Sequence, residues 1–374
     1  MLDKKLFGKM DLIITLIVTL LIGIGVVVLI SATQAYSTGD YSEVKKQMFW
    51  VIAGIVAMAI FLMVDYEALS SYSFHLYMGI MVLLIAVLFT PPINGASSWF
   101  NFGAFSIQPS EIAKIVLIIS LAKHIEKILA KDELGINKPK SLIILLLHAG
   151  LPILLILNQP DFGTAMVIMA ILVSMIFIAN INYKFIGSIA AITIAGIAII
   201  RYLILQGNNL FFMPHQAKRI RVFFDPTLDP LGSGYNVLQS QLAIGSGGMT
   251  GMGLFRGTQT QLGNIPAKTT DFIFSVIGEE LGFVVCVTVV LLFVFLLIRG
   301  VHIARNARDI YGTLVATGVT AMLATHIVVN IGMTIGLVPV TGIPLPFISY
   351  GGSSLLTNMM GIGLLMNVGS KVKK

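Results

Sequence analysis

The chain of 374 residues has very little charge. Only 11% of its residues are Asp, Glu, Lys or Arg, whereas 56% are hydrophobic, and the mean hydropathy is +0.93. Soluble domains carry charge on about a quarter of their residues. The composition therefore excludes an ordinary water-soluble protein and indicates stacked transmembrane helices, in which every backbone polar group is bonded internally.

Cysteine is almost absent as well. Cys286 is the only one, and it lies in an apolar run, which excludes an intrachain disulfide and a cysteine metal cluster. The metal-binding H-E-x-x-H pattern, the P-loop and the Rossmann glycine pattern are also missing. The histidines are scattered, so we expect them to form interhelical hydrogen bonds rather than a metal site. We predict no protein-built metal site and no resident cofactor, although a divalent cation, Mg²⁺ or Mn²⁺, is compatible with the sequence.

Long apolar runs make up most of the chain. A helix that crosses a bilayer needs about 20 apolar residues. The sequence contains about ten such runs, which predicts one all-α polytopic membrane domain over residues 1–374. The predicted spans are residues 12–32, 47–64, 73–90, 110–127, 142–158, 162–180, 186–205, 272–298, 313–335 and 351–369.

Lys and Arg in short loops mark the cytoplasmic side of a membrane protein. Here they fall mainly in the two termini and in the loops after the fourth, sixth and eighth predicted spans, all on one side. We therefore predict cytoplasmic N and C termini and one large extracellular loop, residues 206–270. The formal charge of +7 is then mostly a topology signal. Because the basic residues are dispersed and no nucleic-acid-binding module is visible, a nucleic-acid partner is not expected.

Ionisable residues near the outer ends of spans are candidates for function, because burying them in lipid is costly. Glu111 and Lys114 stand three residues apart at a predicted helix start, so they share one face and can pair. These two residues either form an internal ion pair that fixes helix packing or contact the substrate. Asp161 lies at a tight turn, where a helix cap is the favoured interpretation.

The extracellular loop contains three cations within four residues, namely Lys218, Arg219 and Arg221. Such a run is either a solvated surface or a site for an anionic group such as a diphosphate. The glycines of residues 245–253 either let the backbone approach a ligand or form turns. Asp271 stands at the rim of an apolar span, where it is either a helix cap or a carboxylate whose partial desolvation suits a general base. Glu279 and Glu280 more readily satisfy interhelical partners.

Several motifs together resemble one known family. They cover nearly the whole chain in the order found in the RodA/FtsW/SpoVE (SEDS) family, and two loop motifs are more similar to its elongation-type branch. The motifs are Gln108-Pro109-Ser110-Glu111, Gln159-Pro160-Asp161-Phe162-Gly163-Thr164, Thr270-Asp271-Phe272-Ile273-Phe274, Gly278-Glu279-Glu280-Leu281-Gly282, Asn330-Ile331-Gly332 and Pro339-Val340-Thr341-Gly342-Ile343-Pro344-Leu345-Pro346-Phe347-Ile348-Ser349-Tyr350-Gly351-Gly352-Ser353-Ser354; the two branch motifs are Asp229-Pro230-Leu231-Gly232-Ser233-Gly234-Tyr235-Asn236 and Gly257-Thr258-Gln259-Thr260-Gln261-Leu262.

The resemblance implies a ten-span peptidoglycan glycosyltransferase in the bacterial cytoplasmic membrane, with its active site on the outer face. It would join lipid II units into glycan strands during cell-wall elongation and release undecaprenyl diphosphate. Asp271 matches the essential aspartate of the family, and Trp99 matches a functional tryptophan. The implied partner is a class B penicillin-binding protein, a transpeptidase.

This chain departs from the family pattern close to the implied site. Ser98 and Thr269 stand where the family commonly has Arg and His, and Ala267 stands where it has Glu. Fewer groups are therefore left to assist Asp271, although Lys268 could contribute charge.

The implied mechanism is inverting glycosyl transfer with Asp271 as general base. The residues that we expect to bind substrate, some of them as cations beside the leaving diphosphate, are Trp99, Glu111, Lys114, Lys218, Arg219 and Arg221. A lipid II flippase or transporter, a non-enzymatic scaffold, and a division or sporulation polymerase of the same family are the alternatives. The candidate polar groups cluster at the outer ends of the spans, which favours polymerisation over transport.

Overall fold

The computed structural model describes residues 10–34, 41–92, 97–103, 105–132, 134–182, 187, 195–196, 221–229 and 232–371. Within these residues the chain is mostly helical, as predicted, with one short antiparallel hairpin. The helices are α2 (Leu12–Gln34), α3 (Ser42–Met63), α4 (Tyr66–Ser71), α5 (Ser73–Val87), α6 (Pro109–Lys131), η1 (Gly135–Asn137), α7 (Pro139–Leu157), α8 (Phe162–Ile178), η2 (Pro226–Leu228), α11 (Ser233–Ser246), α12 (Thr258–Gln261), α13 (Ile273–Asn306), α14 (Ile310–Thr334) and α15 (Gly352–Gly369), and the hairpin pairs β1 (Phe100–Asn101) with β2 (Ser106–Ile107).

A helix occupies every predicted span that falls within the described residues. The boundaries agree closely for most of them, although α13 continues to Asn306, beyond the predicted end at residue 298. The predicted span over residues 186–205 lies outside the described residues, apart from isolated positions.

Five of the described helices, α2, α3, α7, α13 and α14, are long and apolar enough to cross a bilayer. Helices α5 and α8 are apolar but shorter. Helices α6 and α15 carry more polar side chains, among them the buried Lys114 and Asn358. A span tolerates polar groups when they face the interior of the bundle rather than lipid. The fold is therefore that of a polytopic membrane protein, while the count of about ten spans stays a prediction.

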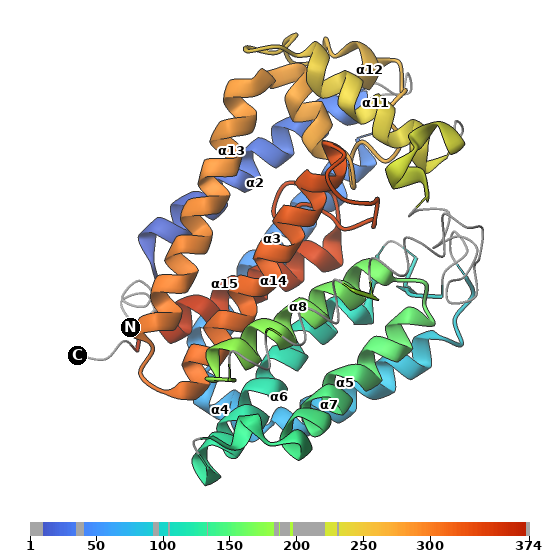
Figure 1. Cartoon of the computed structure of the whole chain (residues 1–374). Coiled ribbons are helices and arrows are strands. Elements are labelled where there is room, and N and C mark those ends of the chain that lie inside the picture. The colour runs from blue at the N-terminus through green and yellow to red at the C-terminus, as the bar shows by residue number, and fades with distance from the viewer. Residues whose placement is uncertain are drawn as a thin grey trace.

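The helices form one bundle around α14 and α15. Helix α15 packs against α3, α6 and α14, and α14 also packs against α8 and α13. Figure 1 shows α11 and α12 at one end of the bundle, whereas the start of α2 and the end of α15 lie at the other end. The bundle end that carries α11 and α12 is called the α11 end below. The opposite end is called the terminal end.

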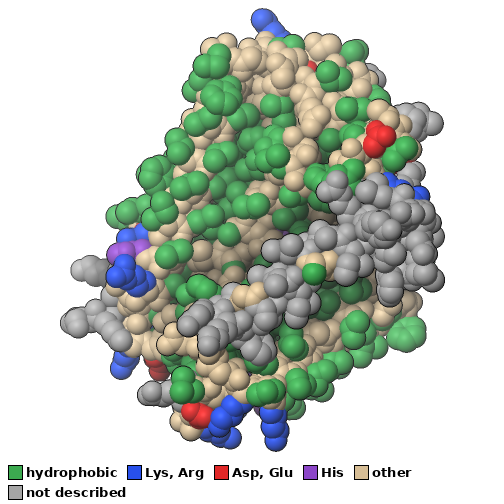
Figure 2. Space-filling model, in the orientation of Figure 1, with side chains coloured by type: hydrophobic (Ala, Val, Ile, Leu, Met, Phe, Trp, Pro, Cys, Tyr) green, Lys and Arg blue, Asp and Glu red, His purple; other side chains and the backbone are tan. Residues whose placement is uncertain are grey.

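The surface of the bundle is largely apolar. Figure 2 shows hydrophobic side chains across the middle of the visible face, and most of the visible Lys and Arg side chains along its lower and left-hand edges. Large side chains such as Phe295 and Ile298 are more than half exposed. Apolar area of this extent is stable against lipid rather than water.

Helix α13 is broken near its start, which the sequence did not predict. Gly282 has a φ of 78° and a ψ of −178°, outside the helical region. The break leaves backbone groups on both sides of it without helical partners. Residues 248–253 replace those partners, because Met252 and Gly253 donate their N–H groups to the carbonyls of Glu279 and Glu280, both at 2.9 Å.

Two glycines of residues 245–253 allow the close approach of two backbones. A Cβ atom on Gly247 would collide with the Gly278 carbonyl, and one on Gly251 would collide with the Glu280 carbonyl. Residues 247–250 form a turn, and Gly248, Gly251 and Gly253 have a positive φ. The turn interpretation is therefore confirmed, whereas close approach to a ligand stays a prediction.

We predict that Gly282→Ala lowers the free energy of unfolding by about 2–4 kcal/mol, because a Cβ atom is strained at this positive φ and would meet the backbone of residues 250–251. Thermal unfolding of the purified protein measures the change. Gly79→Ala is the control, since Gly79 is exposed in α5 and nothing lies within 4 Å of its added Cβ. The control should be neutral or stabilising by up to about 1 kcal/mol. Equal stability of both variants would contradict the account of the break.

Candidate functional site

Asp271 lies in a turn at the α11 end, just before the broken start of α13. The N-cap position of α13 is Phe272, and it forms no side-chain cap hydrogen bond. Asp271 therefore stands one residue before the N-cap position of this helix. Its side chain is partly exposed, whereas Phe272 behind it is buried. The carboxylate thus stands at the boundary between the packed interior and the surface.

The backbone of Asp271 is held by α14. Asn330 donates its side-chain amide to the carbonyls of Asp271 at 2.9 Å and Ile343 at 2.8 Å. Asn330 is fully buried, and its hydrogen bond to Ile343 forms away from water, whereas the one to Asp271 is partly buried. One amide group therefore ties the turn that carries the carboxylate to the non-helical segment between α14 and α15.

That segment, residues 339–351, is called the inner loop below. It is joined to the Asp271 turn by Ser349, whose hydroxyl donates to the Thr270 carbonyl at 2.6 Å and accepts from the Leu345 N–H at 2.8 Å. The Tyr350 N–H donates to the Thr269 carbonyl at 2.8 Å. These bonds satisfy backbone groups that a helix would otherwise pair, and they fix the turn from two sides.

The inner loop also approaches the Asp271 carboxylate directly. Gly342 has a φ of 76°, and a Cβ atom there would lie 3.6 Å from Asp271 Oδ2. On the other side of the loop, a Cβ atom on Gly163, in the first turn of α8, would meet Ile343 and the Thr341 carbonyl. The loop is therefore packed between the Asp271 turn and the start of α8.

Glu111 and Lys114 pair inside the bundle, as their spacing predicts. Lys114 Nζ lies 2.8 Å from Glu111 Oε2 and 2.8 Å from His326 Nε2, and Lys114 is 0% exposed. The first contact is an ion pair rather than a directed hydrogen bond, because Glu111 Oε2 lacks a hydrogen-bond partner of good geometry. Contact of the pair with a substrate stays a prediction.

His326 links this ion pair to the inner loop. Its Nδ1 lies 3.3 Å from the Pro344 carbonyl, which can only accept, so Nδ1 carries the proton and Nε2 accepts from Lys114. No local pattern in the sequence predicts the link to the Pro344 carbonyl, because the partners are far apart in the chain. The interhelical hydrogen bond expected of the scattered histidines is confirmed here.

Asp161 caps α8, as predicted. Its Oδ1 accepts from the Thr164 N–H at 2.9 Å, and its Oδ2 accepts from Gln108 Nε2 at 2.9 Å and from the Ser110 hydroxyl at 3.1 Å. The cap therefore also joins the start of α8 to the start of α6. Two segments matched by the family motifs thus meet in one hydrogen-bonded cluster.

Trp99 lies beside this cluster at the start of the β1–β2 hairpin and is partly exposed. Its neighbour Ser98 is buried and donates its hydroxyl to the Gln159 carbonyl at 2.8 Å. The residue that departs from the family pattern is thus used to anchor the hairpin next to the start of α8. The role of Trp99 in substrate binding stays a prediction.

Glu279 and Glu280 have partners outside their own helix, as predicted. Glu279 accepts from the Gln259 N–H at 2.6 Å and from the N–H and hydroxyl of Thr260 at 2.9 and 2.6 Å, and Glu280 accepts from Gln261 at 3.2 Å. Lys268 is buried beside them and donates to the Thr260 carbonyl at 2.8 Å. Burial lowers the pKa of Lys268, while the carboxylates of Glu280, Glu43 and Glu279 act in the opposite direction. The charge of Lys268 is therefore close to these acids, and its contribution to the Asp271 site stays a prediction.

Of the predicted basic cluster, Arg221 lies within the described residues, whereas Lys218 and Arg219 lie outside them. The residues after Arg221 pack close to the start of the inner loop. They share the lining of a pocket of about 140 Å³, which includes Val222, Phe223, Val338 and Pro339. The structure therefore places the end of the basic segment beside the same loop that contacts Asp271.

Within the described part of the chain, no group of three or more His, Cys, Asp or Glu side chains is placed to hold a metal ion. A divalent cation bound with the substrate stays a prediction.

Comparisons with known proteins agree on one family. The FtsW/RodA/SpoVE family, described as cell cycle protein, matches residues 11–374. The chain is 37% identical to stage V sporulation protein E of Bacillus subtilis, over 96% of both chains. It is 34% identical to the peptidoglycan glycosyltransferase MrdB of Escherichia coli, over 88% of this chain and 86% of that one. Among solved structures, the chain is similar to one from a study of how a peptidoglycan synthase complex coordinates polymerization and crosslinking. The two chains share 29% identity with a TM-score of 0.78, and the match covers 96% of this chain and 97% of that one.

The interior ion pair leads to a prediction about stability. Lys114→Met should lower the free energy of unfolding by about 3–5 kcal/mol, because it leaves the buried carboxylate of Glu111 without a countercharge. The double variant Glu111→Leu with Lys114→Met should recover most of that loss. Denaturant or thermal unfolding measures both.

The control is Lys123→Met, which removes a lysine paired at 2.7 Å with Glu126 on the same helix but partly exposed. Lys123→Met should lower the free energy of unfolding by less than about 1 kcal/mol. If Lys114→Met were as mild as the control, the Glu111–Lys114 pair would not be an interior contact in the folded protein.

Proposed function

The chain belongs to the FtsW/RodA/SpoVE family and is a peptidoglycan glycosyltransferase, and on this basis we propose that it polymerises lipid II into glycan strands during cell-wall elongation. One observation carries the assignment of the site. Asp271 is a partly exposed carboxylate whose backbone is fixed by a buried amide and by the inner loop. A fixed carboxylate at the rim of an apolar core is suited to accept a proton during reaction.

In the proposed reaction the 4-hydroxyl of the acceptor GlcNAc attacks C1 of the donor MurNAc. The new bond forms between the hydroxyl oxygen and C1, and the bond from C1 to the diphosphate oxygen breaks. Asp271 takes the hydroxyl proton, the electron pair of the broken bond leaves with undecaprenyl diphosphate, and the configuration at C1 inverts. The carboxylate must lie within hydrogen-bond reach of the hydroxyl, and the bonds from Asn330 and Ser349 restrict the turn that carries it.

The leaving diphosphate needs fixed positive charge. We assign this task to Arg221 with Lys218 and Arg219, because the segment after Arg221 packs beside the inner loop. Lys114 is a second candidate from the sequence, but it is enclosed by Glu111 and His326. Its contribution in this arrangement is to hold the inner loop through His326, and a direct contact with the diphosphate would require the bundle to open.

Trp99 and Glu111 complete the proposed substrate region. The partly exposed indole of Trp99 offers a flat apolar face beside the start of α8, which suits a sugar ring or a lipid stem. The apolar flanks of the bundle would hold the polyprenyl tails, so that the reacting sugars remain at the membrane surface.

We further propose that the α11 end faces outward, with the terminal end in the cytoplasm. The distribution of Lys and Arg in the sequence supports this orientation. A class B penicillin-binding protein is the proposed partner, and the similarity to a chain from a peptidoglycan synthase complex supports it. The proposed elongation role rests on two loop motifs, since stage V sporulation protein E and the peptidoglycan glycosyltransferase MrdB have similar identities to this chain.

A lipid II flippase is the second candidate function. A transport path needs polar groups that continue from one end of the bundle to the other. Here the polar chain from Asp271 through the inner loop to Lys114 lies towards the α11 end, and below it the centre of the bundle is filled by apolar side chains of α6, α14 and α15. This arrangement favours polymerisation at one surface.

Removing the proposed base tests the assignment. Asp271→Asn should lower the rate of lipid II polymerisation by at least about 100-fold, because the amide cannot accept the hydroxyl proton. A gel of glycan products made by purified protein measures the rate. Asp225→Asn, an exposed carboxylate that caps η2 in the same predicted loop, is the control and should retain activity. Polymerisation by Asp271→Asn at the wild-type rate would exclude Asp271 as the general base.

The basic segment gives a separate prediction. Arg221→Gln should lower kcat/KM for lipid II about tenfold, since a charge-assisted hydrogen bond to the diphosphate contributes about 1.5–3 kcal/mol. Arg256→Gln removes the same charge from an exposed position in the same predicted loop and should change kcat/KM less than about twofold. The same loss in both variants would show that the loop acts only through its overall charge.

A further inference from the structure

A polar pocket of about 470 Å³ opens at the terminal end of the bundle, far from the Asp271 turn along every helix that lines it. Its walls come from α4, α6 and the start of α14. It is called the terminal pocket below, and it is lined by Glu67, Ser70, Lys123, Glu126, Arg308, Asp309 and Tyr311.

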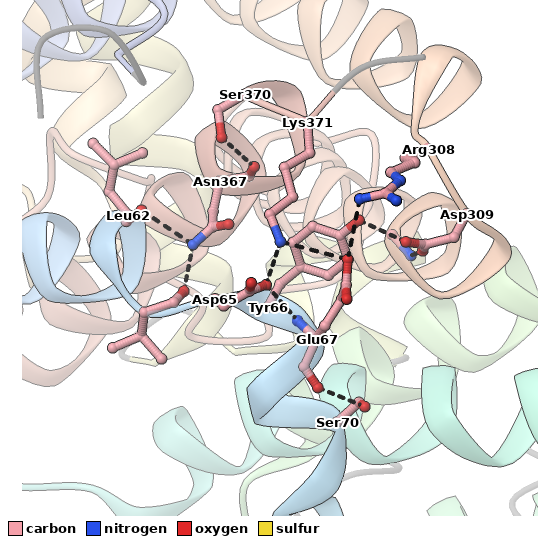
Figure 3. Close-up of polar contacts among 12 residues, drawn as sticks. Leu62, Asp65, Tyr66, Glu67, Ser70, Arg308, Asp309, Asn367, Ser370 and Lys371 are labelled. Atoms are coloured by element: carbon pink, nitrogen blue, oxygen red, sulfur yellow. Dashed lines mark hydrogen bonds and ion pairs between the residues drawn. The ribbon is translucent and has the colours of Figure 1, made fainter. Parts of the chain in front are cut away.

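The wall on the α4 side is part of a hydrogen-bonded network, which Figure 3 shows. Tyr66 donates its hydroxyl to Asp309 Oδ2 at 2.6 Å, and Lys371 Nζ lies 2.6 Å from Asp65 Oδ1 and 3.4 Å from Glu67 Oε1. Burial and the carboxylates of Asp309, Glu67 and Asp65 raise the pKa of Tyr66, so its hydroxyl remains protonated and available to donate. These bonds hold the wall in place without filling the pocket.

The same network shows how this end of the fold binds a cation. Lys371 Nζ pairs with the carboxylate of Asp65 and lies 4.9 Å from the ring centroid of Tyr66. Tyr66 in turn stacks on Tyr311, with ring centroids 6.0 Å apart. An ammonium group is therefore already held by the carboxylates of Asp65 and Glu67 and by one aromatic ring next to the pocket.

Tyr311 is the feature that points to a ligand. Its side chain lines the terminal pocket, it is only 3% exposed, and its hydroxyl has no hydrogen-bond partner among the residues that the structure describes. Burying a hydroxyl without a partner costs free energy that phenylalanine would avoid. The hydroxyl therefore stands ready for a group that is brought into the pocket from outside.

The charges around the pocket select a cation. The lining contains three carboxylates, those of Glu67, Glu126 and Asp309, against the two basic side chains of Lys123 and Arg308. Glu126 pairs with Lys123 at 2.7 Å, but both remain about a quarter exposed and can exchange partners. A phosphate or carboxylate would meet more repulsion than attraction in this pocket, whereas a guanidinium would find acceptors on several sides.

We propose that the terminal pocket binds a basic side chain, an arginine above all, from the segment that flanks a membrane span of a partner protein. This rests on the proposed cytoplasmic position of the terminal end, because cytoplasmic segments next to spans are enriched in Lys and Arg. The guanidinium donates to Glu126 and to the Tyr311 hydroxyl, and its flat face lies near the tyrosine rings. The pocket would thereby hold the partner at the membrane surface opposite the catalytic residues.

Binding of a labelled peptide tests the proposal. The probe is a fluorescent pentapeptide, Gly-Arg-Gly-Arg-Gly, and its match replaces both arginines with citrulline, which has the same shape without the charge. Fluorescence anisotropy with the purified full chain should show at least about tenfold tighter binding of the arginine peptide. Tyr311→Phe should weaken that binding about tenfold, and Glu126→Gln should weaken it to a similar degree.

Two controls separate binding from folding and from catalysis. Tyr311→Phe should melt at the same temperature as the wild type or higher, since it removes an unpaired buried hydroxyl, and it should retain lipid II polymerisation. Asp132→Asn removes a partly exposed carboxylate near the same end, outside the pocket, and should bind the peptide as the wild type does. Equal binding of the arginine and citrulline peptides, or unchanged binding by Tyr311→Phe, would overturn the proposal and leave the assignment of Asp271 untouched.

Discussion

The structure depends on one constraint, that backbone which leaves the helical path inside a membrane bundle must find other hydrogen-bond partners. The inner loop is such a segment, and its partners are contributed by several distant parts of the chain. Asn330 and Ser349 bind the carbonyls of the Asp271 turn, and Gln47 of α3 donates to the Ser349 carbonyl at 3.2 Å. Because these bonds are needed to bury the loop at all, they also fix the position of the carboxylate beside it.

The same constraint explains the break in α13 and the polar groups of α6. The freed backbone around Gly282 is paired by residues 248–253, so the short first part of α13 is held at the angle that places the Asp271 turn. The Glu111–Lys114 pair is costly to bury by itself. It gains a third partner in His326, and through that residue it supports the Pro344 carbonyl of the inner loop. Charge in the interior thus contributes to the shape of the site.

Much of the fold could be predicted from the sequence, because apolar runs and caps are local signals. The long apolar helices of the described residues fall where hydropathy predicts them, whereas α11 and α12 lie within the predicted loop. Asp161 caps α8 as its position indicates. The break at Gly282 was not predictable, since a glycine in an apolar run has the same local pattern whether the helix continues or not. The link from Lys114 to His326 joins residues far apart in the chain, so no local pattern reveals it. The residues alone marked Asp271 as a cap or a base, and the structure places it one residue before the N-cap position of α13.

We propose an enzyme that polymerises at one membrane surface, with Asp271, Arg221 and Trp99 near the α11 end. The most direct test uses the purified protein, without a partner, in lipid vesicles that contain lipid II. Glycan strands on a gel, and the transfer of lipid II between leaflets, are measured on the same sample. The account predicts glycan strands together with released undecaprenyl diphosphate. Transfer of lipid II between leaflets without any glycan strands would contradict it.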